Sequence, residues 1–328
     1  MIEPQSRARR RIGRLGRSLA RGTRTDAASP PGAEVVAGAC VLITGAARGM
    51  GEIYARKAVA QGARAVALWD IDGPRAEALA RELSTAPGTE VRAFVVDISD
   101  LDAIRAGVAA VESTLGAPDI LVNNAGIVRG APFWEHDPER DIEGTMRVNS
   151  LAPMWLTREV VLPVMMADRG RAKRILTIAS AAGTLPNPNM SVYAASKWAA
   201  IGWSESMRLE LARAGHRHIA VTTFCPSYVS TGMFAGARGP LLTPIMTPEE
   251  AAAAAWNGML AGTPVVNRPW TVKLAMAYRG VLPTRAWDFV ADRVFHVYSS
   301  MDRFTGRQEA GPAKSGPAHG PESPRISR

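Results

Sequence analysis

Short apolar runs alternate with longer stretches of helical periodicity from about residue 37 to residue 265. Most positions within these runs are apolar, which is typical of strands that are covered on both faces of a parallel sheet. The expected strands are 40–43, 65–69, 91–96, 120–122, 174–178 and 219–224, with a last one at 264–266. Strands of this kind that alternate with helices predict layers of helix on both sides of one sheet.

Helical periodicity fills the segments between the runs, at 50–61, 74–84, 101–114 and 138–166 and around Tyr193. Two more amphipathic helices, Trp270 to Leu282 and Arg285 to Tyr298, are separated by Pro283. The predicted fold class is α/β, a single doubly wound (Rossmann-type) parallel sheet flanked by helices on both faces, with a helical C-terminal extension. The expected boundaries are a domain at 37–265 and an extension at 266–307.

The basic charge is concentrated at the two ends of the chain. The 328 residues carry a net charge of +9, yet residues 1–34 alone hold eight arginines against three acidic residues. We therefore predict a disordered Arg-rich tail at 1–36, a flexible tail at 308–328 and no specific nucleic-acid binding. Ile12, Leu15 and Leu19 have helical spacing, so an alternative is that this tail lies on an anionic membrane surface.

Two cysteines, Cys40 and Cys225, both fall inside apolar runs. They cannot form a disulfide framework, and we expect two buried thiols in a cytoplasmic protein. Peripheral contact with a membrane is the alternative location. We predict no metal site.

A glycine-rich segment, Thr44 to Gly51, follows the first expected strand and opens a helix. Glycines there permit a tight turn and let the backbone approach a pyrophosphate, which the helix N-terminus stabilises. The order strand, turn, helix therefore indicates a dinucleotide site, whereas a purely structural turn is the alternative.

Asp70 ends the second expected strand, about twenty residues beyond the glycines. A carboxylate there accepts hydrogen bonds from the adenosine ribose and repels a 2′-phosphate, which favours NAD over NADP. Arg48 argues for NADP, because a basic residue in this loop can meet a 2′-phosphate. We give Asp70 more weight, and a helix N-cap is its alternative role.

Tyr193 and Lys197 are four residues apart, so their side chains lie on one face of a helix. A nearby ammonium group lowers the pKa of a phenol, which would let Tyr193 exchange a proton at neutral pH. A packed ring beside a solvated charge is the alternative for this pair.

Taken together, these motifs resemble those of the short-chain dehydrogenase/reductase family over roughly residues 37–265. The resemblance rests on Thr44-Gly45-x-x-x-Gly49-x-Gly51, Asp97-Ile98, Asn123-Asn124-Ala125-Gly126, Asn149, Ser180, Tyr193 with Lys197, and Pro226-x-x-Val229-x-Thr231. It implies that Tyr193 is the general acid/base and that Lys197 lowers its pKa and binds the nicotinamide ribose. Ser180 would bond the same substrate oxygen, and Asn149 would order a water that links Lys197 to solvent.

The resemblance also implies a set of residues that hold NAD, with NADP as the alternative. They are Thr44, Gly45, Arg48, Gly49, Met50, Gly51, Asp70, Asp97, Ile98, Asn124, Ala125, Gly126, Tyr193, Lys197, Pro226, Val229 and Thr231. Two residues depart from the family pattern. Ser227 replaces the usual glycine after Pro226, and Ala179 replaces a common serine. Family members are usually homo-dimers or homo-tetramers, and we expect the same here.

The expected substrate is a small hydrophobic alcohol or ketone, such as a sterol, retinoid or long-chain compound. Its expected contacts are Leu185, Pro186, Met190, Met233, Phe234, Leu241, Leu242, Ile245 and Met246. The end of the extension, Ser300 to Arg307, resembles that of retinol-dehydrogenase-like members. The aromatic and apolar residues from Trp270 to Phe295 are expected to cover the protein's own body, and the alternatives are the substrate mouth, a subunit contact or a membrane surface. The predicted function is an NAD-dependent oxidoreductase. The alternatives are an NADPH-dependent ketoreductase and a non-catalytic nucleotide-binding protein recruited through its basic tails.

Overall fold

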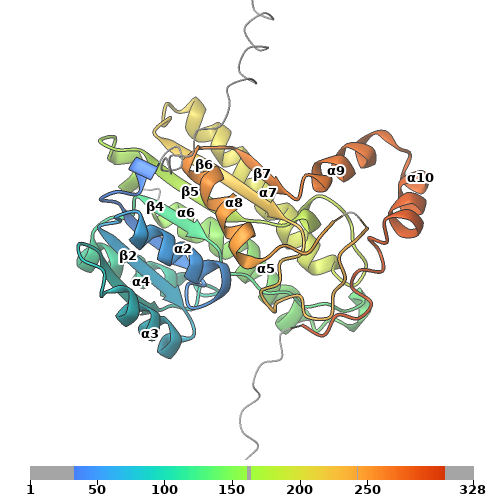
Figure 1. The fold of residues 1–328 in the computed structure, drawn as a ribbon, viewed down its shortest axis with the longest axis horizontal. Helices are drawn as coiled ribbons and strands as arrows, with labels where there is room; N and C mark the ends of the chain where they lie inside the picture. Colours follow the sequence, from blue (N-terminus) through green and yellow to red (C-terminus); the bar gives the residue numbers. More distant parts are fainter. Residues whose placement is uncertain (1–32, 161–163, 242, 307–328) are drawn as a thin grey trace, which may run out of the picture. The chain divides into compact units, whose positions relative to one another are not determined.

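The computed structural model describes residues 33–160, 164–241 and 243–306. A seven-stranded sheet runs through this part of the chain in the order β3-β2-β1-β4-β5-β6-β7, with every neighbouring pair parallel (Figure 1). The strands are β1 (Cys40–Thr44), β2 (Ala65–Asp70), β3 (Glu90–Val95), β4 (Ile120–Asn123), β5 (Lys173–Ile178), β6 (Ile219–Pro226) and β7 (Val265–Arg268). The predicted fold class is confirmed.

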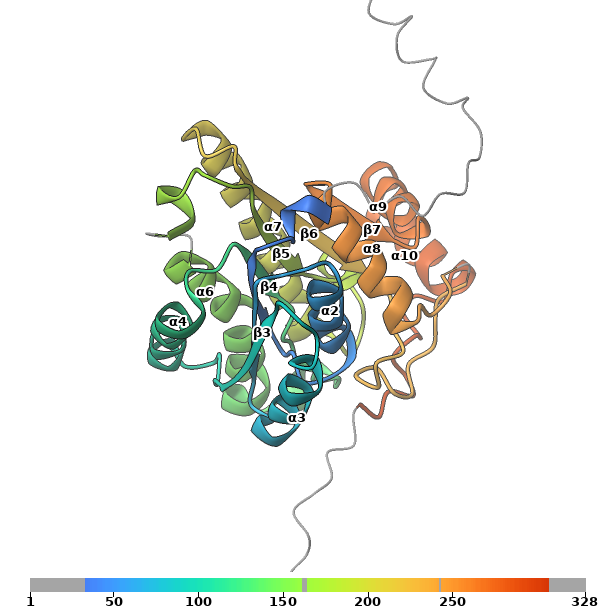
Figure 2. The same cartoon turned by 60° about the vertical axis from the view of Figure 1, so that its left-hand side comes forward.

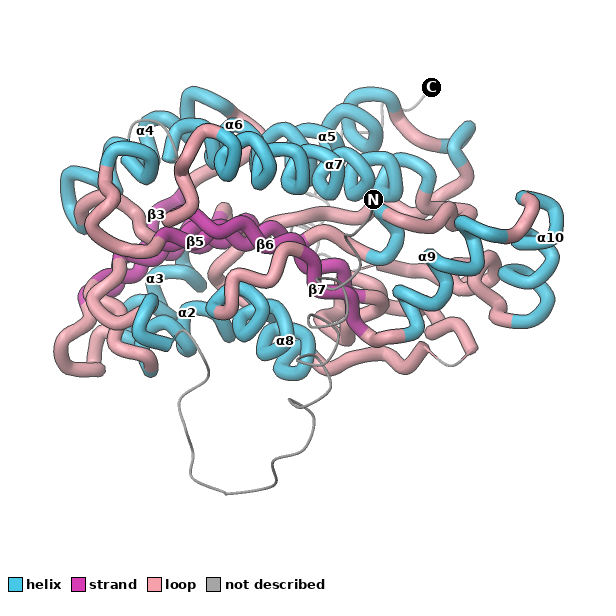
Figure 3. Tube along the Cα trace, turned by 90° about the horizontal axis from the view of Figure 1, so that it is seen from above, coloured by secondary structure: helices cyan, strands magenta, loops and turns pink. Residues whose placement is uncertain are grey.

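Helices cover both faces of the sheet, as Figures 2 and 3 show. One face carries α2 (Gly49–Ala60), α3 (Gly73–Leu83) and α8 (Pro248–Leu260), and the other carries α4 (Leu101–Leu115), α6 (Ala152–Val160) and α7 (Ser191–Arg213). Successive strand residues point to opposite faces, so Val41 and Ile43 pack under α2 and α8 whereas Leu42 packs under α4. This alternation explains why most positions within each strand are apolar.

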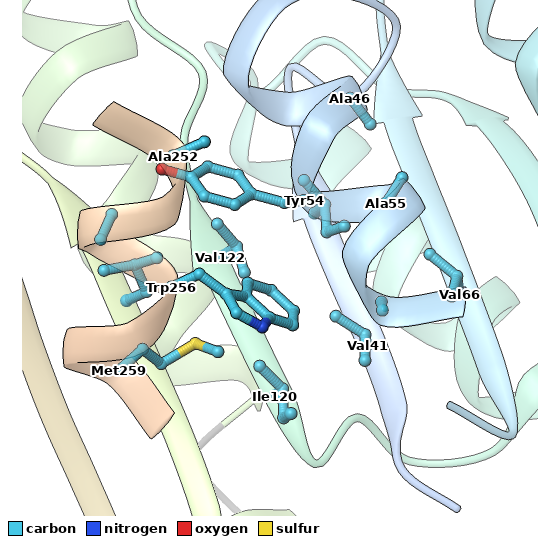
Figure 4. Packing of buried hydrophobic residues seen from close by; sticks show 14 of the residues in the cluster. Val41, Ala46, Tyr54, Ala55, Val66, Ile120, Val122, Ala252, Trp256 and Met259 are labelled. Carbon is cyan, nitrogen blue, oxygen red and sulfur yellow. The ribbon is translucent and has the colours of Figure 1, made fainter. Parts of the chain in front are cut away.

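The core beneath α2 and α8 is built around two stacked aromatic rings (Figure 4). Tyr54 of α2 and Trp256 of α8 are fully buried, and their ring centroids lie 5.9 Å apart. The indole nitrogen of Trp256 donates a hydrogen bond to Oε1 of Gln61, at 3.0 Å. These contacts fix the two helices against each other beside β1 and β4. Between these two strands the order reverses: β2 and β3 are added on one side of β1, and β4 to β7 on the other.

The long helix predicted at 138–166 is interrupted. Between Pro138 and Val160 the chain forms π-helical turns at Pro138–Glu143 and Arg147–Leu151, a short α5 (Gly144–Met146) and then α6. Pro153 has no backbone N–H, so it cannot make the α-helical hydrogen bond to the carbonyl of Asn149. The interruption therefore falls at a residue with a predicted catalytic role.

The C-terminal extension forms α9 (Thr271–Val281) and α10 (Thr284–Phe289), which lie beyond β7 in Figure 1. The second helix was predicted at Arg285 to Tyr298, and α10 begins next to that start but ends earlier, at Phe289. After α10 only a π-helical turn at Val290–Val294 follows, and His296 adopts a positive φ of 54°, which ends helical structure. The last strand continues to Arg268, three residues past the predicted end of the domain.

The described part of the chain begins inside the segment that was predicted to be disordered. Val35 and Val36 are buried in the core, and the guanidinium of Arg171 donates hydrogen bonds to the carbonyls of Val35 and Ala37. The predictions for residues 1–32 and 307–328, including the Ile12-Leu15-Leu19 stripe, lie outside the described residues. Cys40 and Cys225 are buried and unpaired, as predicted. Among the described helices, none has the length and apolar character needed to cross a membrane.

Candidate active site

The glycine-rich turn lies at the carboxyl end of β1. Gly51, the last glycine of this turn, has no room for a side chain. A Cβ on Gly51 would lie 2.0 Å from the carbonyl oxygen of Gly45, and a Cβ on Gly45 would lie 2.9 Å from the Cα of Ala125. Gly45 and Gly49 both have positive φ angles, 63° and 59°, which favour glycine. The turn thus brings the start of α2 and the end of β4 close together.

Asn124 joins this turn to the neighbouring strand. Its amide nitrogen donates to the carbonyl oxygens of Thr44 and Gly45, at 2.9 and 3.1 Å. The hydroxyl of Thr44 in turn accepts from the backbone N–H groups of Asn124 and Ala125, at 3.0 and 3.1 Å. The glycine-rich turn after β1 and the segment after β4 are therefore joined by hydrogen bonds at the point where the strand order of the sheet reverses.

Asp70 points toward the glycine-rich turn. Its Oδ2 accepts from the backbone N–H of Ala47 at 2.9 Å, and its Oδ1 accepts from that of Asp72 at 3.0 Å. The N-cap of α3 is Asp72, which accepts from the N–H of Arg75, so the alternative role for Asp70 is wrong. Each carboxylate oxygen keeps acceptor capacity beyond these bonds.

A cleft of about 720 Å³ runs along this edge of the sheet. Eleven of the predicted cofactor residues line it, namely Gly45, Arg48, Gly49, Met50, Asp70, Asp97, Ile98, Asn124, Ala125, Gly126 and Thr231. The other predicted cofactor residues, Thr44, Gly51, Tyr193, Lys197, Pro226 and Val229, do not border it. Thr44 and Gly51 shape the turn from behind, and Val229 pairs with Met246 in the core.

Sequence reasoning missed a polar group at one end of the cleft. Arg129, Glu135, His136, Arg140 and Asp141 line it, and the Arg140 guanidinium bonds the Asp141 carboxylate through Nε and Nη2, each at 2.8 Å. This ion pair holds the pKa of Asp141 well below its usual range. Nothing in the local sequence between β4 and α5 marks these residues, because only the loop's path brings them to the cleft.

Tyr193 and Lys197 lie on the first turns of α7, and both are buried, with exposed fractions of 4%. The Lys197 ammonium donates to the carbonyl of Ile178 at 2.9 Å and lies 5.8 Å from the centroid of the Tyr193 ring. A Cβ on Gly126, at the cleft wall, would lie 3.5 Å from the same nitrogen. The predicted pair is therefore brought together directly behind the cleft.

Burial is the largest cause of the pKa shifts of Tyr193 and Lys197. It raises the pKa of Tyr193 above its usual value of 10, and a hydrogen bond from Ser180 acts in the opposite sense. Burial also lowers the pKa of Lys197 to about 8. The pKa of Tyr193 is therefore raised overall rather than lowered, and the contribution that lowers it comes from Ser180, while the Lys197 ammonium is directed at the carbonyl of Ile178.

Asn149 is buried in the π-helical turn below α7. Its amide donates to the carbonyl of Ile127 at 2.8 Å and to the hydroxyl of Ser196 at 3.1 Å, and its Oδ1 accepts from the N–H of Ile127 at 2.9 Å. The side chain thereby holds the segment after β4 against α7. Its predicted water-ordering role stays a prediction.

A second, mainly apolar cavity of about 120 Å³ lies on the other side of Tyr193. Ser180 lines it, and Phe234, another lining residue, packs edge-on against Tyr193 with centroids 5.8 Å apart. The wall includes Leu185, Pro186, Asn187, Met190, Ser227, Tyr228, Leu241, Thr243, Trp270, Leu274, Ala275, Tyr278, Trp287, Phe295 and Val297. Ser180 therefore borders the apolar cavity, and Tyr193, which lines neither the cavity nor the cleft, packs against Phe234 of the cavity wall.

Five of the predicted substrate contacts line this cavity: Leu185, Pro186, Met190, Phe234 and Leu241. Three others do not. Met233 lines the cleft, Met246 belongs to the core, and Ile245 is exposed, while Leu242 lies outside the described residues. Asn187 and Tyr228 were missed, although Tyr228 stands inside the predicted segment Pro226 to Thr231.

A parallel sheet with a tight glycine turn, a carboxylate at the end of β2 and a cleft along its carboxyl edge defines a Rossmann-type dinucleotide-binding protein. The model of the short chain dehydrogenase family matches residues 39–240. The chain belongs to the short-chain dehydrogenase family. It is accordingly a hydride-transferring oxidoreductase of CH–OH donors that uses a nicotinamide cofactor.

Two curated relatives resemble most of the chain. Estradiol 17-beta-dehydrogenase 11 of Rattus norvegicus is 35% identical over 260 residues, which are 79% of this chain and 85% of that protein. Epidermal retinol dehydrogenase 2 of Mus musculus is 33% identical over 281 residues, or 84% and 87% of the two chains. These similarities confirm the predicted resemblance to a family with retinol-dehydrogenase-like members.

Solved structures resemble the fold. A short-chain dehydrogenase/reductase from Burkholderia phymatum in complex with NAD has a TM-score of 0.67 at 24% identity, covering 75% of this chain and 94% of that one. A metagenomic short-chain oxidoreductase in complex with NADP has a TM-score of 0.58 at 30% identity, covering 70% and 95%. One neighbour binds NAD and the other NADP, so these similarities leave the cofactor of this chain open.

Proposed function

We propose that this protein is an NAD-dependent dehydrogenase that interconverts a hydrophobic alcohol and its carbonyl compound, with Tyr193 as the general acid/base. The observation that carries the proposal is that Ser180 lines the apolar cavity, while Tyr193 packs against Phe234 of the cavity wall and lies beside Lys197, which is behind the cleft at Gly126. A substrate oxygen at the inner end of the cavity would face both hydroxyl groups.

The cleft fits a dinucleotide on its own geometry. The close packing leaves no space for a side chain at Gly45 or Gly51, and the turn leads into the N-terminus of α2, where backbone N–H groups favour a pyrophosphate. When bound, the nicotinamide supplies or accepts the hydride. Lys197, directly behind Gly126, is placed to bind the ribose next to it.

The chain's own residues handle the proton. In alcohol oxidation Tyr193 takes the hydroxyl proton of the substrate, and Ser180 donates a hydrogen bond to the same oxygen. The hydrogen bond from Ser180 favours the phenolate form of Tyr193, which burial otherwise disfavours. In the reverse direction Tyr193 returns the proton as the carbonyl is reduced.

The preference for NAD rests on Asp70. Its carboxylate lines the cleft, is fixed by two backbone N–H groups, and would repel a 2′-phosphate at that place. Arg48 lines the same cleft and is exposed, so it is free to turn toward solvent. The fixed carboxylate therefore outweighs the exposed guanidinium.

The substrate class follows from the cavity wall, which is formed largely by aromatic and aliphatic side chains from the loop between β5 and α7, the segment after β6, and α9. The two curated relatives are named for estradiol and retinol, both largely apolar alcohols. A sterol-like, retinoid-like or long-chain alcohol is accordingly proposed.

The catalytic assignment is tested with Tyr193→Phe, measured as NAD reduction over a panel of sterols, retinoids, terpenoid alcohols and aliphatic alcohols. The matched control is Tyr54→Phe, because Tyr54 is equally buried and its hydroxyl has no hydrogen-bond partner among the described residues. We expect Tyr193→Phe to lower kcat at least about 10²-fold and Tyr54→Phe to leave it unchanged. Unchanged turnover in Tyr193→Phe would instead support the non-catalytic alternative.

The cofactor assignment is tested by comparing initial rates with NAD and NADP in the wild type and in Asp70→Asn. The control is Asp72→Asn, which stands two residues away and keeps its helix cap, because asparagine caps helices as well as aspartate does. Asp70→Asn should raise the relative rate with NADP about tenfold or more, while Asp72→Asn should not change it. A wild-type preference for NADP would favour the NADPH-dependent ketoreductase.

Location and assembly are extensions of the same proposal. Trp270, Leu274, Tyr278 and Val281 form an exposed apolar stripe on and beside α9, and the first three also line the cavity. This continuity supports peripheral contact of a cytoplasmic enzyme with a membrane that holds its substrate. A homo-dimer or homo-tetramer stays a prediction, to be tested by light scattering.

A further inference from the structure

Three polar side chains from three separate segments meet beside the mainly apolar cavity, and two of them, Asn187 and Tyr228, line it. Asn187 lies in the loop between β5 and α7, Tyr228 follows β6, and Ser300 belongs to the C-terminal extension. The amide nitrogen of Asn187 lies 3.1 Å from the Tyr228 hydroxyl and 3.1 Å from that of Ser300, and these two hydroxyls are 2.8 Å apart. We call this group the Asn187 network.

The direction of each hydrogen bond follows from counting hydrogens. Ser300 has a single hydroxyl hydrogen and donates it to the carbonyl of Val297 at 2.6 Å. Tyr228 must then donate to the Ser300 oxygen. Both hydroxyl oxygens are left as acceptors, so Asn187 must face them with its NH₂ group, which is the only part of an amide that donates.

This arrangement fixes which way the Asn187 amide is turned. With the amide reversed, its oxygen would lie beside the Ser300 oxygen with no hydrogen between them, and the bond to Tyr228 would need the hydrogen that now joins Tyr228 to Ser300. The Met190 sulfur, 3.5 Å from the same nitrogen, is a further weak acceptor that favours the observed orientation.

The consequence is an orphan acceptor. Oδ1 of Asn187 is buried and has no hydrogen-bond partner among the described residues. Leaving such an oxygen unsatisfied is unfavourable, and the Asn187 network prevents the amide from relieving it by rotation. Asn187 lines the cavity, so a ligand there is the available source of a donor.

We propose that Asn187 recognises a second polar group of the substrate, a hydrogen-bond donor such as a hydroxyl or amine, at a point separate from the reacting oxygen. The substrate class is then a largely apolar diol or amino alcohol. The inference rests on the proposed function, because it concerns the same cavity. The inference adds that one position of the cavity wall favours a substrate group that donates a hydrogen bond and disfavours one that accepts.

The test compares three ligands on one rigid apolar alcohol skeleton, carrying at the second position a hydroxyl, a ketone or a methyl group. Binding to the full-length wild-type protein is measured by quenching of tryptophan fluorescence, since Trp270 and Trp287 line the cavity. The hydroxyl ligand should bind about tenfold tighter than the methyl ligand, and the ketone ligand no tighter than the methyl ligand. Equal affinities for all three, or a preference for the ketone, would overturn the proposal.

Two variants and a control locate the effect. Asn187→Leu should bring the three affinities to within about threefold of one another. Ser300→Ala frees the amide to rotate and present its NH₂ group, so the ketone ligand should gain affinity relative to the methyl ligand. Ser299→Ala, an exposed neighbour, should keep the wild-type order. Retention of that order in Asn187→Leu would contradict the assignment to Asn187.

The binding order does not depend on turnover, which separates the two proposals. If none of the three ligands is oxidised although the hydroxyl ligand binds tightest, the proposed function fails and the recognition by Asn187 stands. If all three are oxidised with equal affinity, the enzyme assignment stands and the recognition by Asn187 fails.

Discussion

The buried ammonium of Lys197 should make the folded protein less stable than a variant without it. Burial lowers the pKa of Lys197 from its ordinary value of 10.5 to about 8, so the protonated side chain destabilises the fold by roughly 3 kcal/mol at pH 7. Lys197→Met keeps a flexible chain of similar length without the charge. The variant loses the hydrogen bond to the carbonyl of Ile178, and this loss offsets roughly 1 kcal/mol of the stability gained by removing the charge.

We therefore expect Lys197→Met to raise the free energy of unfolding by roughly 2 kcal/mol at pH 7 while abolishing turnover. The sign of the pH dependence follows from the lowered pKa. Between about pH 8 and 10.5 the unfolded chain binds more protons at this residue than the folded chain. The contribution of Lys197 to wild-type stability thus rises across that window, and the advantage of the variant fades.

The assay is urea unfolding followed by circular dichroism at pH 7 and at pH 10, with both proteins in the same buffers. Lys273→Met is the matched control, because Lys273 is exposed on α9 and its replacement should change neither stability nor its pH dependence. A Lys197→Met protein that is less stable than the wild type at pH 7, or an advantage that does not shrink at pH 10, would refute the reasoning.

Three further predictions concern the turn, the proton-transfer site and the outer surface. Gly51→Ala places a Cβ 2.0 Å from the carbonyl of Gly45, so NAD affinity measured by calorimetry should fall more than tenfold. The control Gly202→Ala, where nothing lies within 4 Å, should bind NAD normally. Ser180→Ala removes a hydrogen bond that lowers the pKa of the catalytic tyrosine, so kcat for oxidation should drop about 10²-fold and the alkaline rise of its pH profile should move to higher pH; an unmoved profile would contradict this role. Val281→Glu should reduce pelleting with anionic vesicles several-fold without changing turnover of a water-soluble alcohol, because Val281 is 83% exposed and does not line the cavity, and unchanged pelleting would exclude this face as the contact.

Much of the fold could be predicted because the relevant signals are local. A buried parallel strand needs a run of apolar residues, and a tight turn that a nucleotide can approach needs glycine, so both are visible in a few consecutive positions. The strand runs, the turn at Thr44 to Gly51 and the pair Tyr193–Lys197 are of this kind. The interruption of the helix at Asn149 also has a local cause, Pro153, although the periodicity of the flanking residues conceals it.

The sequence by itself thus determined the parallel sheet, the turn at its edge and the residue types available for chemistry, since each depends on neighbours along the chain. Only the tertiary structure decided how those residues act on one another. It directed Lys197 at the carbonyl of Ile178, made Ser180 the group that lowers the pKa of Tyr193, and joined Asn187 to Tyr228 and Ser300. Desolvation and hydrogen-bond direction depend on every group packed around a side chain, and those groups come from distant parts of the sequence.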